Sequence, residues 1–309
     1  MEQTLKVEAK SEGERLDKFL QQSIDSLSRT RVSTLIKEEK ILVNGKVKKP
    51  SYRLKENDSV LARVEENQKD VLKPFEFKVN IIYEDEDLLV IDKPGGLIVH
   101  PPQISADNTL VNALVYMKKE LSDINAYRPG IVHRLDKETS GVMVLAKNNS
   151  SHLKLVEQFA SRKIKKEYFA IVWGIVAKDH IVADLPIARD LKNRLKMKVS
   201  FVQSKNAFTE VDVKERLPDS TFLSLKPRTG RMHQIRVHLK FLGFPIVGDK
   251  KYGIKDSYDE LFLHAHRLGL YHPKKEKFME FVSPLPKRFT EFIEKHRKLN
   301  ENRLGVGDK

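Results

Sequence analysis

The stretch of this sequence that decides the fold is RPGIVHRLDKETSGVMVLA, residues 128–146. Its second part, residues 142–146, is a short apolar run, which predicts a buried strand. Its first part, residues 128–141, is polar and lies between apolar stretches, so we expect a loop that the scaffold holds in place. Loops of this kind are where reactive side chains tend to lie, and this loop is therefore the candidate site.

One carboxylate in this loop, Asp136, stands among His133, Arg134 and Lys137. Nearby positive charge favours the ionised form of a carboxylate, which suits a nucleophile or a base. An alternative stays open on this stretch alone, in which Asp136 caps a turn or pairs with Arg134 and has only a structural role. A protein-kinase loop does not fit, because kinases place the aspartate directly after His-Arg and need an ATP-binding loop upstream.

Outward from the loop, short β-branched and apolar runs predict strands, and apolar residues at helical spacing predict a few helices. Strands are expected at 79–83, 88–92, 142–146, 168–173, 210–214, 222–225, 234–238, 264–271 and 278–282, and helices at 109–119, 151–160 and 287–299. Strands dominate and long crossover helices are scarce. The pattern favours the α+β class, with a mixed, largely antiparallel sheet and flanking helices, over a doubly wound parallel sheet.

The first 62 residues predict a small, separate, basic α/β module. Two short helices are indicated by apolar stripes, Leu16, Phe19, Leu20 and Ile24 in the first, and Val32, Leu35 and Ile36 in the second, with Ser28 as an N-cap. Asn44-Gly45 after the run 41–43 is a strong hairpin signal, with a return through 46–49. We expect this module at 1–62, a linker at 63–76, a larger domain at 77–299 and a disordered tail at 300–309.

Composition excludes several classes of protein. The chain has 57 Lys and Arg against 43 Asp and Glu, a net charge of +14, which favours a polyanionic partner. It has no cysteine, so disulfides, thiolate catalysis and Cys-ligated metals are excluded. No apolar run is long enough to span a bilayer and residues 1–10 lack the apolar core of a signal peptide, so a soluble, cytoplasmic protein is expected.

Motifs for cofactors and metals are missing from the sequence. There is no Gly-rich phosphate loop with Lys-Ser/Thr and no Gly-x-Gly-x-x-Gly motif, so nucleotide hydrolysis and dinucleotide redox chemistry are not expected. His264 and His266 lack a third ligand at metal-site spacing, which favours a packed or hydrogen-bonded pair over a metal site. We therefore expect neither a cofactor nor a metal.

Two further segments add candidate residues. Tyr168 follows a basic run at the start of a predicted strand, where its ring can stack on an unpaired base; a buried strand aromatic is the alternative. Residues 228–239 are RTGRMHQIRVHL. Alternation there predicts a strand with Ile235 and its apolar neighbours on one face and Arg236 on the other. For Arg236 the alternative is a phosphate contact or a surface ion pair.

These segments resemble two known families. ERLDKFL at 14–20, SRTR at 28–31 and ILVNGK at 41–46 are similar to the S-four-like RNA-binding domain. The rest resembles the pseudouridine synthases of the RluA/RluD type, which act on structured RNA and most often on large-subunit ribosomal RNA. The segments that carry this likeness are 92–94, 99–101, 109–112, 133–141, Tyr168, 229–239 and 248–249. One departure is the stretch 101–108, which lacks the glycines expected there.

The resemblance implies the pseudouridine synthase fold and roles for particular residues. Asp136 looks like the catalytic aspartate, Tyr168 like the tyrosine against the uracil ring, and Arg236 like the arginine paired with the aspartate. Contacts with RNA are expected at Arg134, His133 and Arg231 and, in the N-terminal module, at Arg15, Arg29, Arg31, Lys46, Lys48 and Lys49. The reaction is an isomerisation that consumes no cofactor, metal or nucleotide, and the target base must leave its stack. A monomer acting on RNA is expected.

Two rival functions remain. A non-catalytic RNA-binding ribosome-assembly factor predicts no chemistry at any uridine. A nucleoside hydrolase or glycosidase requires a second acid beside Asp136, for which Glu138 is the only near neighbour in the sequence. The combination of Asp136, Tyr168 and Arg236 favours the synthase, because a protein that only binds RNA has no need of a lone carboxylate facing phosphates.

Overall fold

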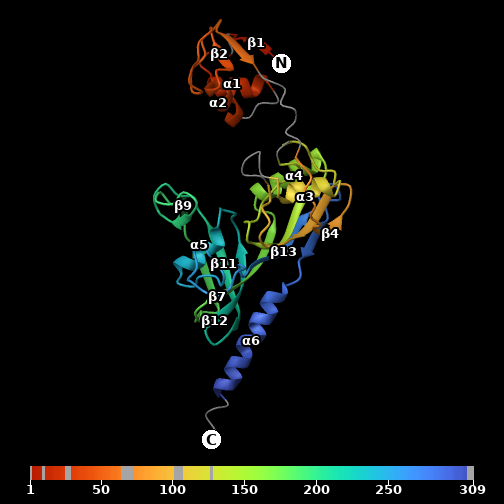
Figure 1. Ribbon diagram of the computed structural model, residues 1–309, viewed down its shortest axis with the longest axis vertical. Coiled ribbons are helices and arrows are strands. Elements are labelled where there is room, and N and C mark those ends of the chain that lie inside the picture. The colour runs from red at the N-terminus through yellow and green to blue at the C-terminus, as the bar shows by residue number, and fades with distance from the viewer. Residues whose placement is uncertain are drawn as a thin grey trace. The chain divides into compact units, whose positions relative to one another are not determined.

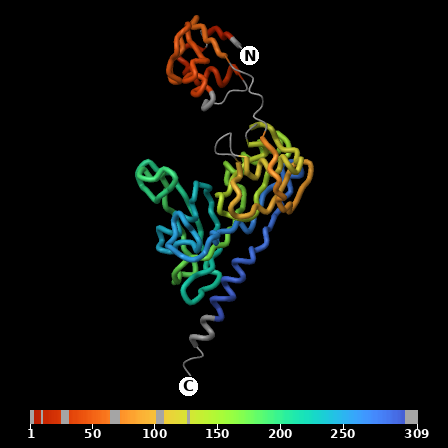
Figure 2. Tube along the Cα trace, in the orientation of Figure 1, coloured from red at the N-terminus to blue at the C-terminus, as the bar shows by residue number. Residues whose placement is uncertain are grey.

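The computed structural model describes residues 2–8, 11–24, 29–63, 72–100, 107–125 and 128–304, with the backbone alone at 2–3, 29–31 and 299–304. The chain divides into two compact units, Met1–Val71 and Leu72–Lys309 (Figures 1 and 2). None of the described helices is long and apolar enough to cross a bilayer.

The N-terminal unit packs two helices, α1 (Leu16–Ser23) and α2 (Arg29–Lys37), on a three-stranded antiparallel sheet. The sheet order is β1-β3-β2, formed by β1 (Glu2–Lys6), β3 (Ser59–Arg63) and β2 (Ile41–Val43). The predicted apolar stripes of both helices form its core, with Leu16, Leu20, Val32, Leu35 and Ile41 almost fully buried. The predicted N-cap Ser28 lies outside the described residues.

The predicted hairpin in this unit is only half right. Asn44 and Gly45 both adopt the left-handed conformation, with φ of 51° and 73°, as the turn requires. The return strand through residues 46–49 is wrong, because β2 pairs with β3 and Lys46 makes a single bridge to Val43. The Asn44 amide explains the difference: it donates to Asp58 at 2.7 Å and accepts from the Ser59 N–H at 2.8 Å, which ties the turn to the start of β3.

The larger unit is built on one nine-stranded sheet. Its order is β4-β5-β6-β13-β7-β12-β11-β8, with β14 paired to β13. The strands are β4 (Asn80–Glu84), β5 (Leu88–Lys93), β6 (Ser140–Ala146), β7 (Lys165–Trp173), β8 (His180–Asp184), β11 (Phe208–Arg216), β12 (Ser220–Pro227), β13 (Leu263–Tyr271) and β14 (Phe278–Val282). Every pairing in it is antiparallel except β6 with β13. The predicted mixed, largely antiparallel sheet is confirmed.

Helices and a small hairpin complete this unit. The helices are α3 (Leu110–Tyr116), α4 (Asn149–Ala160), α5 (Gln234–Phe241) and α6 (Lys287–Leu304), and the hairpin joins β9 (Ile187–Arg189) to β10 (Met197–Val199). Helix α6 continues to Leu304, so residues 300–304, expected in a disordered tail, are helical. Strands β8, β9 and β10 are not among the predicted strands of this unit, and the last two are only three residues long.

The core of this unit has two parts that meet at β13. The first half of the unit buries the apolar side chains of β5 and β6 with those of α3 and α4, and the second half those of β7 and β12 with α5 and α6. Strand β13 contributes Leu268 to the first part and Leu263 to the second. The parallel contact between β6 and β13 requires a glycine at 141, where φ is +120° and a Cβ would lie 2.2 Å from the Ala265 carbonyl oxygen.

The strand predicted at 234–238 is wrong, because these residues form helix α5. Ile235 and Leu239 lie one turn apart and face the second part of the core. Val237 faces a separate small cluster with Ile187 and Tyr252. The helix is therefore buried on more than one side, so the alternation of apolar residues carried no information about which secondary structure forms.

The histidines of β13 are packed and hydrogen-bonded, as predicted. His264 Nδ1 lies 3.0 Å from Ser140 Oγ. His266 Nδ1 lies 2.9 Å from the Ser283 carbonyl oxygen, and its ring stacks on Phe169 with centroids 4.1 Å apart.

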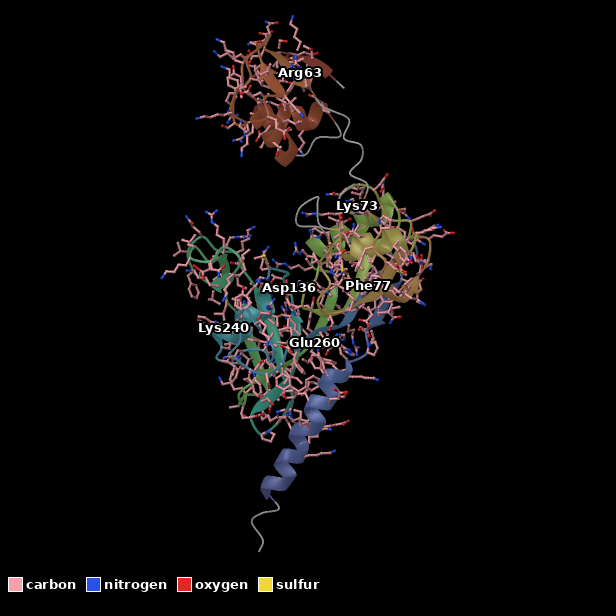
Figure 3. All side chains as sticks on the ribbon, in the orientation of Figure 1. Arg63, Lys73, Phe77, Asp136, Lys240 and Glu260 are labelled. Carbon is pink, nitrogen blue, oxygen red and sulfur yellow. The ribbon has the colours of Figure 1, made fainter. Side chains whose placement is uncertain are left out.

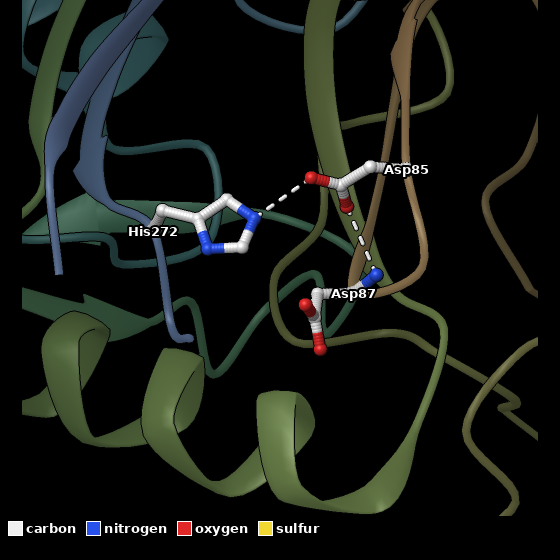
Figure 4. A group of neighbouring side chains, drawn as sticks. All are labelled: Asp85, Asp87 and His272. Carbon is white, nitrogen blue, oxygen red and sulfur yellow. Dashed lines mark hydrogen bonds and ion pairs between the residues drawn. The ribbon is translucent and has the colours of Figure 1, made fainter. Parts of the chain in front are cut away.

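Asp85, Asp87 and His272 form a second polar cluster (Figure 4). His272 Nδ1 accepts the Lys275 N–H at 2.9 Å, so Nε2 carries the proton and donates it to Asp85 at 2.9 Å. Asp87 accepts from Ser151 Oγ at 2.8 Å. Both ring nitrogens of His272 are thus occupied, and the cluster ties the β4–β5 turn to the end of β13 and to the start of α4.

Candidate active site

The loop that carries Asp136 ends where β6 begins, next to β13. Figure 3 shows Asp136 between the two halves of the larger unit. Its side chain is 18% exposed and lines a small cavity of about 90 Å³. Tyr168 from β7 and Arg236 from α5 line the same cavity, so the structure brings together the three residues predicted to be catalytic.

Arg236 is held by a buried carboxylate that the sequence analysis did not assign. Its Nε and Nη2 donate to the two oxygens of Asp249 at 2.8 and 2.7 Å, and both side chains are at most 2% exposed. Its Nη1 lies 3.3 Å from Asp136 Oδ2 and 3.3 Å from Glu138 Oε2. Asp249 is thus the main partner of Arg236, and Asp136 and Glu138 both lie at its remaining nitrogen, Nη1.

The charges of this group are fixed by their surroundings. Burial alone would lower the pKa of Arg236, but the hydrogen bonds and charge of Asp249 raise it above its ordinary value. Burial would raise the pKa of Asp249, but the bonds from Arg236 and from the backbone N–H groups of Tyr252 and Lys251 lower it overall. The guanidinium is therefore a permanent, pre-positioned positive charge beside Asp136.

One wall of the cavity is formed by β7. Burial, with the charge of Asp136, raises the pKa of Tyr168, so its phenol stays protonated at neutral pH. Lys166, two residues earlier on the same face, lines the cavity and donates to the Thr229 carbonyl oxygen at 3.3 Å. Burial lowers the pKa of Lys166 to about 8.

His233 also lines the cavity and immediately precedes α5. Its backbone is left-handed, with φ of 55°. Its Nδ1 lies 2.7 Å from the Tyr252 hydroxyl, and its Nε2 lies 4.0 Å from Asp136 Oδ2. Burial lowers the pKa of His233, the charge of Asp136 opposes this and that of Arg236 adds to it, so the imidazole is neutral at pH 7.

A buried lysine, Lys93, holds the loop that carries Asp136 through a hydrogen bond to its main chain. Lys93, at the end of β5, is fully buried, and its Nζ donates to the carbonyl oxygens of Pro94, Leu97 and Lys137 at 2.8, 2.9 and 3.1 Å. Burial lowers the pKa of Lys93 to about 7, although Asp136 and other nearby carboxylates oppose the shift. Three main-chain oxygens are thereby satisfied inside the core.

Gln234 fixes the segment that enters α5. Its Oε1 accepts from Thr229 Oγ1 at 2.7 Å and from the Arg231 N–H at 3.0 Å. Its Nε2 donates to the Phe208 carbonyl oxygen and to Thr209 Oγ1, both at 3.0 Å. The amide uses its full hydrogen-bonding capacity, so its role is structural.

The residues predicted to contact RNA lie in different places. Arg134 and Arg231 line the cavity. His133 instead accepts the Val144 N–H through Nε2 at 3.1 Å and stacks on Phe159, with centroids 4.6 Å apart. Burial lowers the pKa of His133 to about 3, and this packing gives no support to an RNA contact.

In the N-terminal unit, the predicted RNA-contacting residues differ in exposure. Lys46 and Lys49 are exposed, and Lys48 lies over the Tyr52 ring at 5.2 Å. Arg15 pairs with its neighbour Asp17 at 2.9 Å. The side chains of Arg29 and Arg31 lie outside the described part of the structure.

A larger cavity of about 420 Å³ shares Arg236 with the first and is also lined by Glu138. Lys196, Lys250 and Arg288 line it as well, together with acidic side chains. At Arg236 the Asp136 cavity therefore adjoins a wider depression that is lined by both basic and acidic side chains.

The comparisons with known proteins agree with this site. A model of the RNA pseudouridylate synthase family matches residues 87–241, and a model of the S4 domain matches residues 14–60. The chain is 45% identical over 301 residues to an uncharacterized RNA pseudouridine synthase of Aquifex aeolicus, covering 93% of this chain and 95% of that one. It is 38% identical over 298 residues to the ribosomal large subunit pseudouridine synthase D of Pasteurella multocida, covering 91% of each.

A solved structure gives the same result. Human RNA pseudouridylate synthase domain containing 4 superposes with a TM-score of 0.57 and 30% identity, covering 71% of this chain and 93% of that one. The fold and site thus define an RNA-modifying isomerase rather than a protein that only binds RNA. The chain belongs to the RNA pseudouridylate synthase family, and it converts uridine to pseudouridine in RNA.

Proposed function

We propose that this enzyme modifies one or a few uridines of large-subunit ribosomal RNA, as a cytoplasmic monomer, with Asp136 as its catalytic carboxylate. Relatives at 37–38% identity over nearly the whole chain bear the name ribosomal large subunit pseudouridine synthase D, among them that of Escherichia coli K12. The observation that carries the assignment is the placement of Asp136 Oδ2 3.3 Å from a buried arginine, in one cavity with Tyr168.

The chemistry explains this arrangement. In the isomerisation the bond from C1′ to N1 of uracil breaks and a bond from C1′ to C5 forms, while a proton leaves C5 and N1 gains one. An attack of Asp136 on C1′ and a proton abstraction from the sugar both need an ionised carboxylate. Arg236 Nη1 donates to that carboxylate at 3.3 Å and places a fixed positive charge beside it.

The remaining cavity residues bind and hold the base. A cavity of about 90 Å³ has room for a single base and not for a base pair, so the target uridine must leave its stack. Tyr168 offers a ring against which the base packs. Lys166, Arg134 and Arg231 supply positive charge at the cavity for the phosphates on either side.

A basic hairpin that lines the larger, adjoining cavity extends the proposed RNA surface. Leu191 and Leu195, in the loop between β9 and β10, have side chains that are 82% and 74% exposed, and Phe201, after β10, is 76% exposed. Lys192 and Arg194 lie between them in the sequence, and both are exposed. Exposed apolar side chains alternating with cations suit stacking on bases and contact with phosphates.

The test is carbodiimide-based mapping of pseudouridine in total RNA from cells with the gene intact, deleted, or complemented by a variant. Deletion should remove one or a few large-subunit sites, which wild type restores and Asp136→Asn does not. Asp179→Asn is the matched control, since this carboxylate is 87% exposed and pairs with Arg216 on the surface. Loss of sites in transfer RNA alone would overturn the proposed substrate, and restoration by Asp136→Asn would overturn the role of Asp136.

A further inference from the structure

His233 is the cavity residue whose geometry the reaction described above does not use. It is held in the left-handed conformation, with φ of 55°, which costs free energy for any residue with a Cβ. Its side chain bridges two groups, the Tyr252 hydroxyl on one side and Asp136 on the other. Strained residues of this kind persist where the surrounding structure determines them, most often at functional sites.

The hydrogen bonds around Tyr252 determine which ring nitrogen of His233 carries the proton. The Tyr252 hydroxyl oxygen accepts the Met197 N–H from β10 at 2.7 Å. Among the described residues, the hydroxyl proton has one recorded acceptor, His233 Nδ1 at 2.7 Å. A neutral imidazole that accepts at Nδ1 carries its proton on Nε2, which is the nitrogen that faces Asp136.

Two donors thus approach the same oxygen of Asp136. Arg236 Nη1 lies 3.3 Å from Oδ2, and His233 Nε2 lies 4.0 Å from the same atom. Asp249 fixes the guanidinium, and Tyr252 fixes the imidazole, so neither donor depends on Asp136 for its place. The other carboxylate oxygen, Oδ1, has no recorded hydrogen bond within the described part of the chain.

We propose that His233 is a positioning residue for Asp136: it donates Nε2–H to Oδ2 once RNA fills the cavity, which fixes the carboxylate rotamer and leaves Oδ1 as the reacting oxygen. The inference rests on the proposed role of Asp136. The 4.0 Å separation is longer than a hydrogen bond, and catalytic hydrogen bonds that are long in a free enzyme tighten when substrate binds. Exclusion of water from the cavity strengthens the contact further.

Two substitutions at one position separate this role from a structural one. In His233→Asn the amide nitrogen reaches only the place of Nδ1, so the donor to Asp136 is lost, and asparagine tolerates the left-handed backbone well. In His233→Gln the longer side chain puts an amide N–H at the place of Nε2. His233→Asn should therefore lower kcat about 10- to 100-fold, the loss expected for one hydrogen bond to a charged group. His233→Gln should retain most of the activity, and KM for the RNA should stay unchanged in both.

Tyr252→Phe is the second variant, in case the left-handed backbone at 233 does not accept glutamine. It keeps the ring that lies 5.3 Å from the Arg236 guanidinium carbon, but it removes the hydroxyl that selects the tautomer. Its kcat should fall less than that of His233→Asn, again at unchanged KM, because an imidazole free of Tyr252 still spends part of its time protonated on Nε2.

The decisive experiment measures kcat and KM for the wild type, these variants and Asp136→Asn on one RNA substrate. The proposal is overturned if His233→Asn turns over at the wild-type rate, if Asn and Gln lower kcat equally with Tyr252→Phe unaffected, or if KM alone rises, which would make His233 an RNA-binding residue. Turnover by Asp136→Asn would refute the proposed function instead. An inactive Asp136→Asn beside a fully active His233→Asn would refute this inference alone.

Discussion

The buried pair of Asp249 and Arg236 makes a strong prediction for Asp249→Asn. The two side chains are 1% and 2% exposed and share two hydrogen bonds of 2.7 and 2.8 Å. The substitution keeps the shape and one oxygen, which still accepts the N–H groups of Lys251 and Tyr252. It removes the negative charge, and it turns an amide N–H₂ group toward a guanidinium that can only donate.

The expected loss of stability follows from burial. Removing one partner of a buried ion pair costs about 3–5 kcal/mol, because the other charge is left in the protein interior. Arg236 keeps Asp136 and Glu138, but each at 3.3 Å and both at the same nitrogen, Nη1. We therefore expect a loss at the lower end, about 3 kcal/mol. The released guanidinium should also draw closer to Asp136, which lowers kcat at temperatures where the variant is folded.

Urea unfolding followed by tryptophan fluorescence measures the loss of stability in the larger of the two structural units, which contains Asp249. Trp173 is the single tryptophan of the chain, and its indole N–H donates to Asp256 at 2.9 Å, so its signal reports the larger unit. Asp212→Asn is the matched control, since Asp212 accepts from Lys226 at 2.8 Å on the surface and should contribute at most about 1 kcal/mol. If Asp249→Asn unfolds at the same urea concentration as Asp212→Asn, the buried pair does not stabilise the site in the way described.

Three further perturbations have expected outcomes. Because burial lowers the pKa of Lys166 to about 8, RNA affinity should fall as pH rises from 7 to 9, and binding titrations of Lys166→Met should lack this fall. For Lys93 the pKa is about 7 in the folded protein against an ordinary 10.5, so between these values the unfolded chain binds more protons and wild-type stability rises with pH; urea midpoints of Lys93→Met at pH 7 and 9 should not show this rise. Removal of residues 1–66 should weaken binding of full-length target RNA and reduce its salt dependence more than it slows the chemistry of bound RNA, and unchanged affinity would show that the N-terminal module is dispensable for docking.

The sequence was sufficient for the fold class, because the signals involved are local. Short β-branched runs separated by turns predict strands wherever they pack, and the strands predicted at 79–83 and 88–92 are confirmed as β4 and β5. Helix α5 was missed because it lies inside the core. A helix with apolar contacts on more than one side has no polar face, so period-2 and period-3.6 patterns cannot be told apart over eight residues.

In the site, too, residues with a local sequence signal were predicted, and residues placed only by tertiary contacts were not. Asp136, Tyr168 and Arg236 were recognised because each stands in a distinctive local stretch. Tyr252 was not assigned, and Asp249 was noted only within the segment 248–249 that resembles the family, because their contacts with His233 and Arg236 arise from the turn after α5. Glu138 was considered only as the second acid of a hydrolase, whereas the structure places it at the same arginine nitrogen, Nη1 of Arg236, as Asp136.

The parallel pairing of β6 with β13 has a consequence for when the enzyme can fold during its synthesis. Ser140 and His264, which meet across this contact, are 124 residues apart in the chain. Closing a loop of that length costs about 4 kcal/mol in chain entropy, which must be spent before the contact returns any stability. On the ribosome, the aspartate is synthesised long before the strand that holds its loop in place. A nascent or truncated chain that ends before β13 therefore carries every predicted catalytic residue and still has no active site, and the enzyme gains its chemistry only when its synthesis is nearly complete.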